Sequence, residues 1–360
     1  MKFRFRRNSL ASFFIALSLA CIILYSATRQ YVSSLFKETK LELFNLRQRF
    51  DINENVLAFL HMQKTGGSDF DRNIVRHLLI RKENRWQKAC LSLFSNSSEA
   101  SAYDSKRLFK KTDKFKKFAC IREKTLHERE LNWYFSRQTF GWVCGLHPGM
   151  TQLKDCITEK IYPNIQSDRV VYFTILREPV RRFLSEWQHV RRGATWKRKN
   201  SNQCFSSEYE KCLKTGVKTW TNVSLDDFLA CENNPAFNRQ VKMLANYDSR
   251  LSRCEYSKEQ DEELLRRAKI SLSSLAFFAL NEFQAYSEIL LENSLGRGLF
   301  KFEKKLEQAN DSLAEKFLRQ ILYSNKFYIE KIKKYNSLDE QLYEYAHDLF
   351  FHRLKSNRLI

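Results

Sequence analysis

The chain is poor in the residues that interrupt secondary structure. It has nine glycines and four prolines among 360 residues, which argues against long low-complexity linkers. No internal repeat is visible, and no Cys-x-x-Cys pair suggests a zinc site. What remains is a chain long enough for one large domain or two small ones, with ample apolar residues for a packed core.

Acidic residues are in the minority. The 62 Lys and Arg residues outnumber the 41 Asp and Glu residues, and the formal net charge is +21. Such an excess favours polyanionic partners, which include nucleic acid, an anionic membrane and a sulfated glycan. The charge alone does not choose among these three partners.

The N-terminus carries a long uncharged stretch. Residues 9–28 (SLASFFIALSLACIILYSAT) are mostly apolar, and they follow four cationic residues, Lys2, Arg4, Arg6 and Arg7. We expect a transmembrane signal anchor that leaves residues 1–8 in the cytosol. The alternative is a cleaved signal peptide, although no clear small-x-small motif ends the stretch. Residues 29–52 are expected to form a polar stalk, and residues 53–360 the luminal domain.

Cysteines and glycosylation motifs support a luminal location. Eight of the nine cysteines follow the predicted anchor, at Cys90, Cys120, Cys144, Cys156, Cys204, Cys212, Cys231 and Cys254. This even number fits disulfides in an oxidising compartment. Three Asn-x-Ser sequons begin at Asn96, Asn222 and Asn310. Together these features argue against nucleic-acid binding in the nucleus or cytosol.

Apolar periodicity predicts how the body of the chain is built. Strands are expected at 56–60, 170–176 and 276–280, and helices at 68–82, 179–190, 225–229, 235–244, 257–272 and 337–350. Residues 84–120 are basic and rich in serine, and we expect an irregular insertion with some helix there. Strands that alternate with helices favour an α/β domain with a parallel sheet.

A glycine pair lies where the first predicted strand turns into a helix. Residues 63–67 read QKTGG. Converging backbone N–H groups at such a turn can bind phosphate, helped by the helix N-terminus. Lys64 adds a charge, and Thr65 and Ser68 add hydroxyl groups. The motif is not a Walker A loop, because its lysine precedes the glycines. An ordinary tight turn is the alternative interpretation.

A second polar cluster follows the strand expected at 170–176. Arg177 lies at the carboxyl end of this strand, where α/β proteins place ligand contacts. Pro179 suits the first turn of a helix, and Ser185 lies two helical turns after Arg177. The alternative interpretation is that Arg177 makes only a structural ion pair.

Five stretches of the sequence are similar to one known family. They are residues 59–67 (FLHMQKTGG), 140–147 (FGWVCGLH), 176–197, 238–245 (NRQVKMLA) and 339–350. These stretches resemble the heparan-sulfate 6-O-sulfotransferases, which use 3′-phosphoadenylyl sulfate (PAPS) as donor. The resemblance implies a P-loop-like sulfotransferase fold, with a central parallel sheet flanked by helices. It also implies heparan sulfate chains of proteoglycans as partners and a single-pass type II protein of the Golgi membrane.

The resemblance further implies roles for individual residues. The donor loop is expected to contain His61, Met62, Gln63, Lys64, Thr65, Gly66, Gly67, Ser68 and Asp69. Two residues, Arg177 and Ser185, are expected to hold the 3′-phosphate of the donor. A late donor loop is placed at Glu307, Gln308, Ala309, Leu313 and Ala314. Acceptor contacts are placed at Lys116, Lys117, Arg137, Trp142, His147, His189 and Trp196.

The sequence departs from the family pattern at three places. Ser68 and Asp69 replace a pair of threonines, so that one hydroxyl group is kept. The family has an arginine where we place Leu313, so one donor contact is lost or moved. Residues 84–132 do not align cleanly, which affects the placement of Lys116 and Lys117.

The expected reaction is a direct in-line transfer to the 6-hydroxyl of glucosamine. His147 falls where the family has its base, and a neutral imidazole can take the hydroxyl proton during the attack. Lys64 and the loop amides are expected to stabilise the departing oxygen. This scheme requires no metal, and the sequence has no convincing ligand cluster.

Two other functions remain open from the sequence. One is a glycan sulfotransferase that acts at another position, such as the 2-hydroxyl of heparan, or on chondroitin. The other is a non-catalytic, heparan-binding membrane protein that keeps the fold. The presence of Lys64, Arg177, Ser185 and His147 argues against the second of these.

Overall fold

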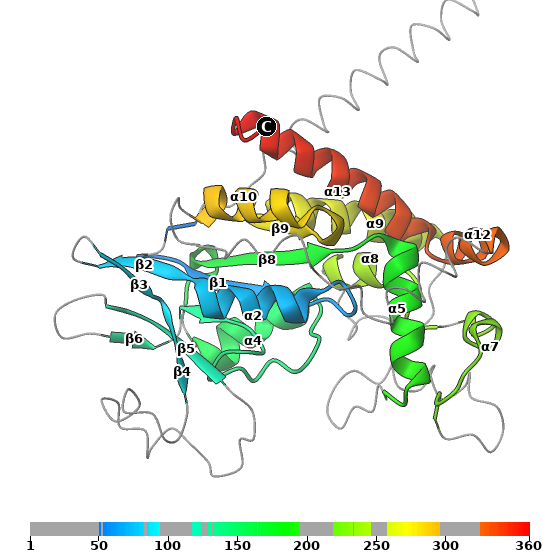
Figure 1. The fold of residues 1–360 in the computed structure, drawn as a ribbon, viewed down its shortest axis with the longest axis horizontal. Coiled ribbons are helices and arrows are strands. Elements are labelled where there is room, and N and C mark those ends of the chain that lie inside the picture. Colours follow the sequence, from blue (N-terminus) through cyan, green and yellow to red (C-terminus); the bar gives the residue numbers. More distant parts are fainter. Residues whose placement is uncertain are drawn as a thin grey trace, which may run out of the picture. The chain divides into compact units, whose positions relative to one another are not determined.

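The predicted apolar strands form the centre of a parallel sheet. In the computed structural model, β1 (Val56–Leu60), β7 (Tyr134–Phe135), β8 (Val170–Leu176) and β9 (Phe277–Leu280) pair in the order β7-β1-β8-β9 (Figure 1). Every pairing in this sheet is parallel, and every residue of the four strands is buried. Burial on both faces explains why these strands are continuous apolar runs. The predicted α/β domain with a parallel sheet is confirmed.

The structure describes a defined part of the chain. It covers residues 50–51, 53–82, 85–93, 117–123, 129–131, 133–163, 165–194, 219–232, 234–245, 258–295 and 325–360. All of them belong to one compact unit, Arg47–Ile360. The predicted anchor at 9–28 lies outside these residues, as does nearly all of the predicted stalk. In the described ranges, no helix combines the length and the apolar character needed to cross a membrane.

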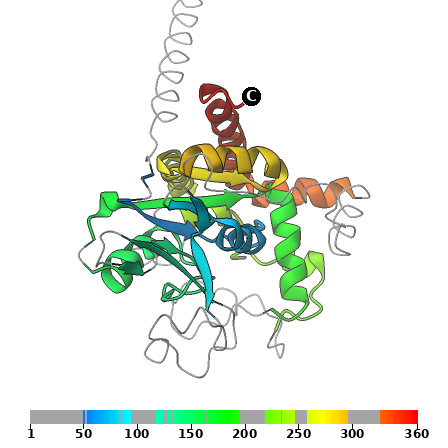
Figure 2. The same ribbon diagram turned by 60° about the vertical axis from the view of Figure 1, so that its left-hand side comes forward.

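Helices flank the sheet and extend beyond its carboxyl edge. The α-helices are α2 (Gly67–His77), α4 (Met150–Cys156), α5 (Pro179–Arg191), α7 (Leu225–Leu229), α8 (Arg239–Leu244), α9 (Lys258–Ser274), α10 (Gln284–Leu295), α12 (Lys326–Tyr335) and α13 (Ser337–Ser356). Single turns of other helix types occur at Ile157–Ile161, Ser167–Arg169 and Asn281–Phe283. Helices α10 and α13 pack against β9. Figures 1 and 2 show α5 beyond the carboxyl end of β8, near α7.

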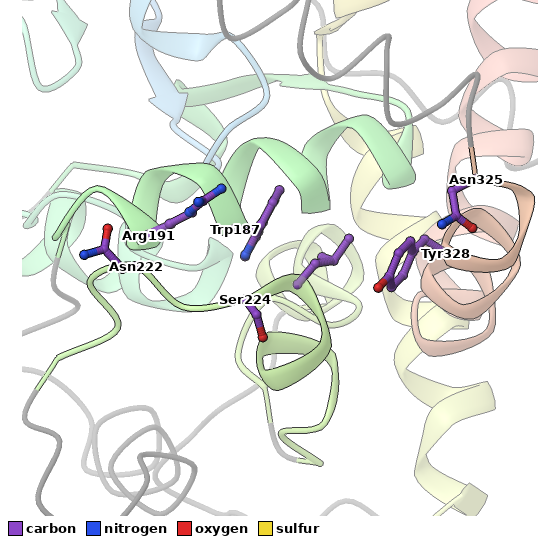
Figure 3. A pocket seen from close by; sticks show the side chains of 7 residues that line it. Trp187, Arg191, Asn222, Ser224, Asn325 and Tyr328 are labelled. Atoms are coloured by element: carbon purple, nitrogen blue, oxygen red, sulfur yellow. The ribbon is translucent and has the colours of Figure 1, made fainter.

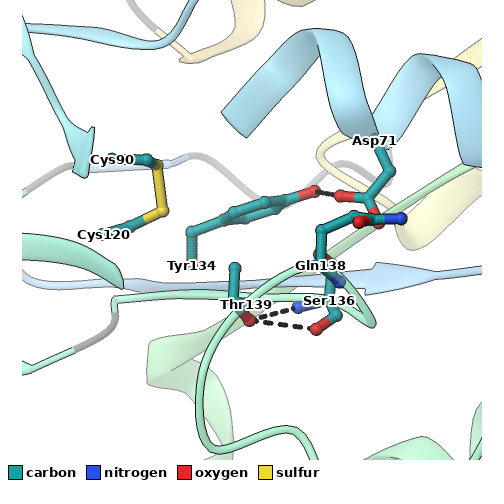
Figure 4. The surroundings of a disulfide bond; sticks show 7 residues. All are labelled: Asp71, Cys90, Cys120, Tyr134, Ser136, Gln138 and Thr139. Carbon is teal, nitrogen blue, oxygen red and sulfur yellow. Dashed lines mark hydrogen bonds between the residues drawn. A yellow bond between two sulfur atoms is a disulfide. The ribbon is translucent and has the colours of Figure 1, made fainter. Parts of the chain in front are cut away.

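Strands occupy part of the region where we predicted an irregular insertion with some helix. β2 (Leu79–Lys82) pairs with β3 (Arg85–Lys88), and β5 (Lys117–Glu123) pairs with both β4 (Cys90–Leu93) and β6 (Arg129–Leu131). A disulfide joins Cys90 to Cys120, which are partners in the β4–β5 register (Figure 4). Within the insertion predicted at 84–120, the described residues of β3, β4 and β5 are therefore extended and not helical, because antiparallel pairing and a covalent link hold them so.

Two predicted helices have different ends in the structure. The helix expected at 68–82 stops at His77, because Leu78 is extended and the next residues pair as β2. The helix expected at 235–244 begins only at Arg239, because Asn238 is left-handed with a φ of 48°. The helix expected from residue 337 is confirmed, and its predicted stripe of apolar side chains is buried. The side chain of its N-cap residue, Asn336, makes no capping hydrogen bond. The carboxamide oxygen of Asn238 instead accepts hydrogen bonds from the backbone of Leu338 and Asp339.

A buried polar contact fixes α2 against the sheet. The Tyr134 hydroxyl on β7 donates a 2.7 Å hydrogen bond to Asp71 Oδ1 on α2 (Figure 4). Burial raises the pKa of Asp71 to about 6, although the bond from Tyr134 opposes this. In the same sheet, the Phe59 ring of β1 stacks on the Phe173 ring of β8, with the ring centroids 4.8 Å apart. These contacts hold the start of α2, and hence the glycine turn, in place relative to β1.

Candidate active site

The glycine turn between β1 and α2 adopts a backbone that favours glycine. Lys64 and Gly66 have φ values of 64° and 87°, and the helix begins at Gly67. A Cβ atom on Gly66 would lie 2.4 Å from Asn281 Oδ1, which is closer than carbon and oxygen can pack. The first N–H groups of α2 have no acceptors within the helix and face this turn. The turn therefore has the backbone of an anion-binding loop.

Arg177 reaches the same turn from the end of β8. Its Nη1 donates a hydrogen bond to the Lys64 carbonyl oxygen at 3.3 Å. Its backbone is held on both sides by Gln240: the Arg177 N–H donates to Oε1, and Nε2 donates to the Arg177 carbonyl, both at 2.9 Å. The structure therefore joins the two segments that the sequence assigned to the donor. Ser185, the other predicted phosphate ligand, is partly exposed on α5.

No role was predicted for Gln240, although it lies in one of the five similar stretches. Gln240 is buried at the start of α8, and its backbone N–H and that of Val241 donate to the Asp339 carboxylate at 3.2 and 2.8 Å. Asp339 lies on α13, so the C-terminal helix supports α8, and α8 supports Arg177. The only signal in the sequence was a cluster of polar residues (NRQ) opening an apolar helix.

A buried ion network lies next to Ser185. Glu186 accepts a hydrogen bond from Arg239 Nη2 at 2.8 Å and also forms an ion pair with Arg182. Burial alone would raise the pKa of Glu186, but Arg239 and Arg182 hold it below its usual value. The network thus places a carboxylate and two guanidinium groups next to Ser185. Sequence reasoning missed it, although Arg182 and Glu186 have the helical i, i+4 spacing of an ion pair.

His147, to which the sequence assigned the role of base, lies against the chain just after β1. Its Nδ1 is 3.2 Å from the carbonyl oxygen of His61, and the two imidazole rings are 5.1 Å apart. A carbonyl oxygen only accepts hydrogen bonds, so this contact requires a proton on Nδ1 and leaves the Nε2 lone pair available. Burial, followed by the charge of Arg137, lowers the pKa of His147 to about 3. The disulfide between Cys144 and Cys156 ties the His147 loop to α4.

Cations gather around the turn. Arg137 Nη2 donates to Ser68 Oγ at 2.6 Å, and Lys117 Nζ donates to the Arg137 carbonyl oxygen at 2.7 Å. Burial lowers the pKa of Lys64, and the charges of Arg192 and Arg177 lower it further. Like charges that share a partly buried space repel one another, and an anion placed among them would relieve this repulsion. The site is therefore electrostatically suited to a highly anionic ligand.

The remaining predicted loop residues are either buried within the loop or lie on the exposed side of α2. Met62 and Gln63 are buried, and the buried Thr65 donates its hydroxyl to the Met62 carbonyl oxygen at 3.2 Å. Asp69 forms an ion pair with Arg72 on the exposed side of α2. The Thr65 proton is thus used inside the loop, and the Asp69 carboxylate neutralises a neighbouring cation.

Two of the predicted acceptor residues lie on the outer side of the site. Trp142 is partly exposed, and its Nε1 donates to the Gly145 carbonyl oxygen at 2.6 Å. Its neighbours Val143 and Leu146 are 59% and 71% exposed, which makes this loop an apolar edge next to His147. His189 is exposed on α5, and its pKa is lowered by desolvation and then by Lys64.

Several predicted site residues lie outside the described ranges. They are Lys116, Trp196, Glu307, Gln308, Ala309, Leu313 and Ala314. Within the residues that the structure does describe, no group of three His, Cys, Asp or Glu side chains is placed to hold a metal ion.

Comparisons with known proteins give a consistent result. The model of the sulfotransferase family matches residues 148–346. Heparan-sulfate 6-O-sulfotransferase 3-B of Danio rerio is 35% identical over 312 residues, which cover 83% of this chain and 65% of the relative. Heparan-sulfate 6-O-sulfotransferase 3 of Homo sapiens is 35% identical over 335 residues, which cover 89% of this chain and 61% of the relative. Heparan-sulfate 6-O-sulfotransferase 2 of Gallus gallus is 34% identical over 331 residues, which cover 87% of this chain and 72% of the relative. The chain thus spans less than two thirds of the length of the first two relatives.

Proposed function

The chain belongs to the sulfotransferase family, and from this premise we propose that it transfers the sulfuryl group of PAPS to the 6-hydroxyl of glucosamine residues in heparan sulfate. The relatives named above are heparan-sulfate 6-O-sulfotransferases. One observation carries the proposal further than the family alone. His147 is held by its Nδ1 against the carbonyl oxygen of His61, three residues before Lys64, whose own carbonyl oxygen accepts a hydrogen bond from Arg177.

The residues at the turn fit a donor with several negative charges. The N–H groups at the start of α2, together with Lys64, would hold the 5′-phosphosulfate of PAPS. Arg177 and Ser185 would hold the 3′-phosphate, with Arg177 oriented by Gln240. Burial, and then the charges of Arg192 and Arg177, lower the pKa of Lys64, and a bound phosphosulfate would offset these charges.

His147 would act as the general base. Nε2 takes the proton of the glucosamine 6-hydroxyl while the hydroxyl oxygen bonds to sulfur. The bond between sulfur and the bridging phosphate oxygen breaks, and that oxygen keeps the electron pair. Lys64 stabilises this developing charge, which is the kind of preorganised electrostatic support that lowers a barrier. The Nδ1–H of His147 remains on the His61 carbonyl, so that the ring keeps its orientation throughout.

The pKa of about 3 for His147 has a consequence for this mechanism. It comes from burial and from the charge of Arg137, and it keeps the imidazole neutral but makes it a weak base. Phosphate and sulfate groups bound beside Arg137 and Lys64 would offset these cations and raise the pKa of His147. The base would therefore gain strength when the anionic substrates are in place.

The acceptor would approach from the side of Trp142 and His189. Arg137 and Lys117 supply positive charge there, and Trp142 supplies a ring that can pack against a sugar. Binding of a sulfated polysaccharide to such a surface weakens as salt concentration rises, because bound counterions are released. Lys116 and Trp196 complete this surface in the proposal, on the basis of the family resemblance.

We also propose that this chemistry takes place in the Golgi lumen, with the chain anchored through residues 9–28. The uncharged stretch and its preceding cations support the anchor. The disulfides Cys90–Cys120 and Cys144–Cys156 support an oxidising compartment.

Incubation of the full-length chain with labelled PAPS and partly desulfated heparan tests the proposed function. We expect label in the polysaccharide, and disaccharide mapping should place it on the 6-hydroxyl of glucosamine. Label on the 2-hydroxyl of the uronic acid, or transfer to chondroitin only, would instead identify a sulfotransferase of another specificity. Binding of heparan without binding of PAPS, measured by calorimetry, would identify a non-catalytic protein.

A further inference from the structure

A cavity of about 380 Å³ lies between α5, α7 and α12, away from the glycine turn (Figure 3). Trp187 and Arg191 of α5 line it, with Tyr328 of α12 at the opposite end. Asn222 and Ser224, which also line it, are the first and third residues of one of the three Asn-x-Ser sequons. The proposed reaction uses none of these groups.

The backbone of this sequon is fixed while its asparagine is exposed. The Asn222 N–H donates to the Arg191 carbonyl oxygen at 2.8 Å, and Trp187 Nε1 donates to the Val223 carbonyl oxygen at 3.1 Å. Asn222 is left-handed, with a φ of 62°, a conformation that asparagine tolerates well. Asn222 is exposed, and Figure 3 shows its side chain at one end of the cavity, pointing away from Trp187. The amide is therefore accessible from outside.

We propose that Asn222 carries an N-linked oligosaccharide. The modification joins C1 of the first N-acetylglucosamine to Asn222 Nδ2 and releases a proton from that nitrogen. The bond from C1 to the pyrophosphate of a lipid-linked oligosaccharide, the co-reactant in the secretory pathway, breaks. Asn-x-Ser is the acceptor pattern for this reaction and requires a surface position in a secreted or luminal chain. The inference therefore rests on the luminal location proposed above.

Ser224 shows when the modification must occur. In the folded chain its hydroxyl caps α7: it accepts from the Asp227 N–H at 3.0 Å and donates to Asp227 Oδ2 at 2.9 Å. The same hydroxyl is part of the acceptor pattern, so it is engaged once α7 has formed. The oligosaccharide is therefore attached before this part of the chain folds.

This double use of Ser224 provides matched variants. Ser224→Thr keeps both the acceptor pattern and a capping hydroxyl. Ser224→Asn keeps an equally good cap but removes the acceptor pattern. Asn222→Asp removes the acceptor nitrogen while it keeps a residue that tolerates a positive φ. Loss of glycan and loss of fold can therefore be separated.

The test is peptide mass spectrometry of the full-length chain and these variants, produced in cells with a secretory pathway. We expect a glycan on the Asn222 peptide of the wild type and of Ser224→Thr. We expect none on that peptide in Ser224→Asn and Asn222→Asp, with the Cys90–Cys120 disulfide formed in every case. An unmodified Asn222 in wild-type chains that contain this disulfide would overturn the inference and leave the proposed activity intact. A chain found outside the lumen would overturn both the inference and the proposed location.

Discussion

Replacing Gln240 with methionine tests how the donor site is supported. Methionine has a similar unbranched shape but makes neither of the 2.9 Å hydrogen bonds to the backbone N–H and carbonyl of Arg177. Each of these buried groups would lose its partner, at a cost of about 1–3 kcal/mol. Part of this cost lowers the free energy of unfolding, and part releases Arg177 from its position.

The loss of donor affinity that Gln240→Met can cause has an upper limit. It cannot exceed the contribution of the Arg177–phosphate contact itself, which for a hydrogen bond to a charged group is about 1.5–3 kcal/mol. At 1.4 kcal/mol for each factor of ten, Gln240→Met should weaken binding of the donor product 3′-phosphoadenosine 5′-phosphate, by at most about 10- to 100-fold. The KM for PAPS should rise accordingly, while the KM for heparan sulfate should not change.

Asn234 offers a matched control away from the site. It is buried, its Nδ2 donates to the Phe228 carbonyl oxygen at 2.6 Å, and its Oδ1 accepts from the Ala236 N–H at 2.9 Å. Asn234→Leu should lower the unfolding temperature about as much as Gln240→Met does, but should leave nucleotide affinity unchanged. Calorimetric titration and thermal unfolding measure both quantities. If Gln240→Met lowers only the unfolding temperature, Gln240 does not position Arg177 for the donor.

Three further predictions follow from the site. Gly66→Ala should abolish donor binding, because the added Cβ would lie 2.4 Å from Asn281 Oδ1. Gly145 has a similar φ of 85° but open space around it, so Gly145→Ala should show only the backbone cost of about 1–2 kcal/mol. Equal effects of the two substitutions in a titration would refute the steric argument. Lys64→Ala should lower kcat by about 100- to 1000-fold, in the range seen when one preorganised donor is lost, and a change in donor KM alone would contradict its role at the departing oxygen. Burial, followed by the charge of Arg137, lowers the pKa of His147 to about 3 from its ordinary value of 6.5. The unfolded chain therefore binds more protons between these pH values, and stability falls as pH drops through this range. His147→Asn should reduce this pH dependence in urea unfolding, and an unchanged slope would contradict the assigned pKa shift.

The sequence predicted three of the four strands of the buried parallel sheet and missed the two-residue strand β7 (Tyr134–Phe135). β1 and β8 are uninterrupted apolar runs with the predicted boundaries, Val56–Leu60 and Val170–Leu176. The strands from Leu79 to Leu131 were not predicted, because they lie outside the central sheet and their pairing depends on a distant register and on the Cys90–Cys120 disulfide. A propensity pattern has no access to either of these constraints.

The residues of the site also fall into a group that could be predicted from the sequence and a group that could not. The glycine turn and Arg177 could be predicted, because the carboxyl ends of neighbouring parallel strands meet at one edge of a sheet. Gln240 and Asp339 could not, because they act through bonds between a side chain and a backbone that join residues 63 and 99 positions apart. Such contacts leave no periodic signal. The contact of His147 with His61 was likewise not predicted: the family resemblance assigned His147 as the base and His61 to the donor loop, but no contact between them.

Comparison of the wild type with His147→Ala tests whether His147 is the general base of the sulfuryl transfer. Sulfate transfer from labelled PAPS to the glucosamine 6-hydroxyl is measured beside the affinity for 3′-phosphoadenosine 5′-phosphate. Because the general base is lost while Lys64 and Arg177 remain, we predict that the variant binds the nucleotide as the wild type does and transfers no measurable sulfate. Transfer by the variant at the wild-type rate would contradict the assignment of His147 as the base.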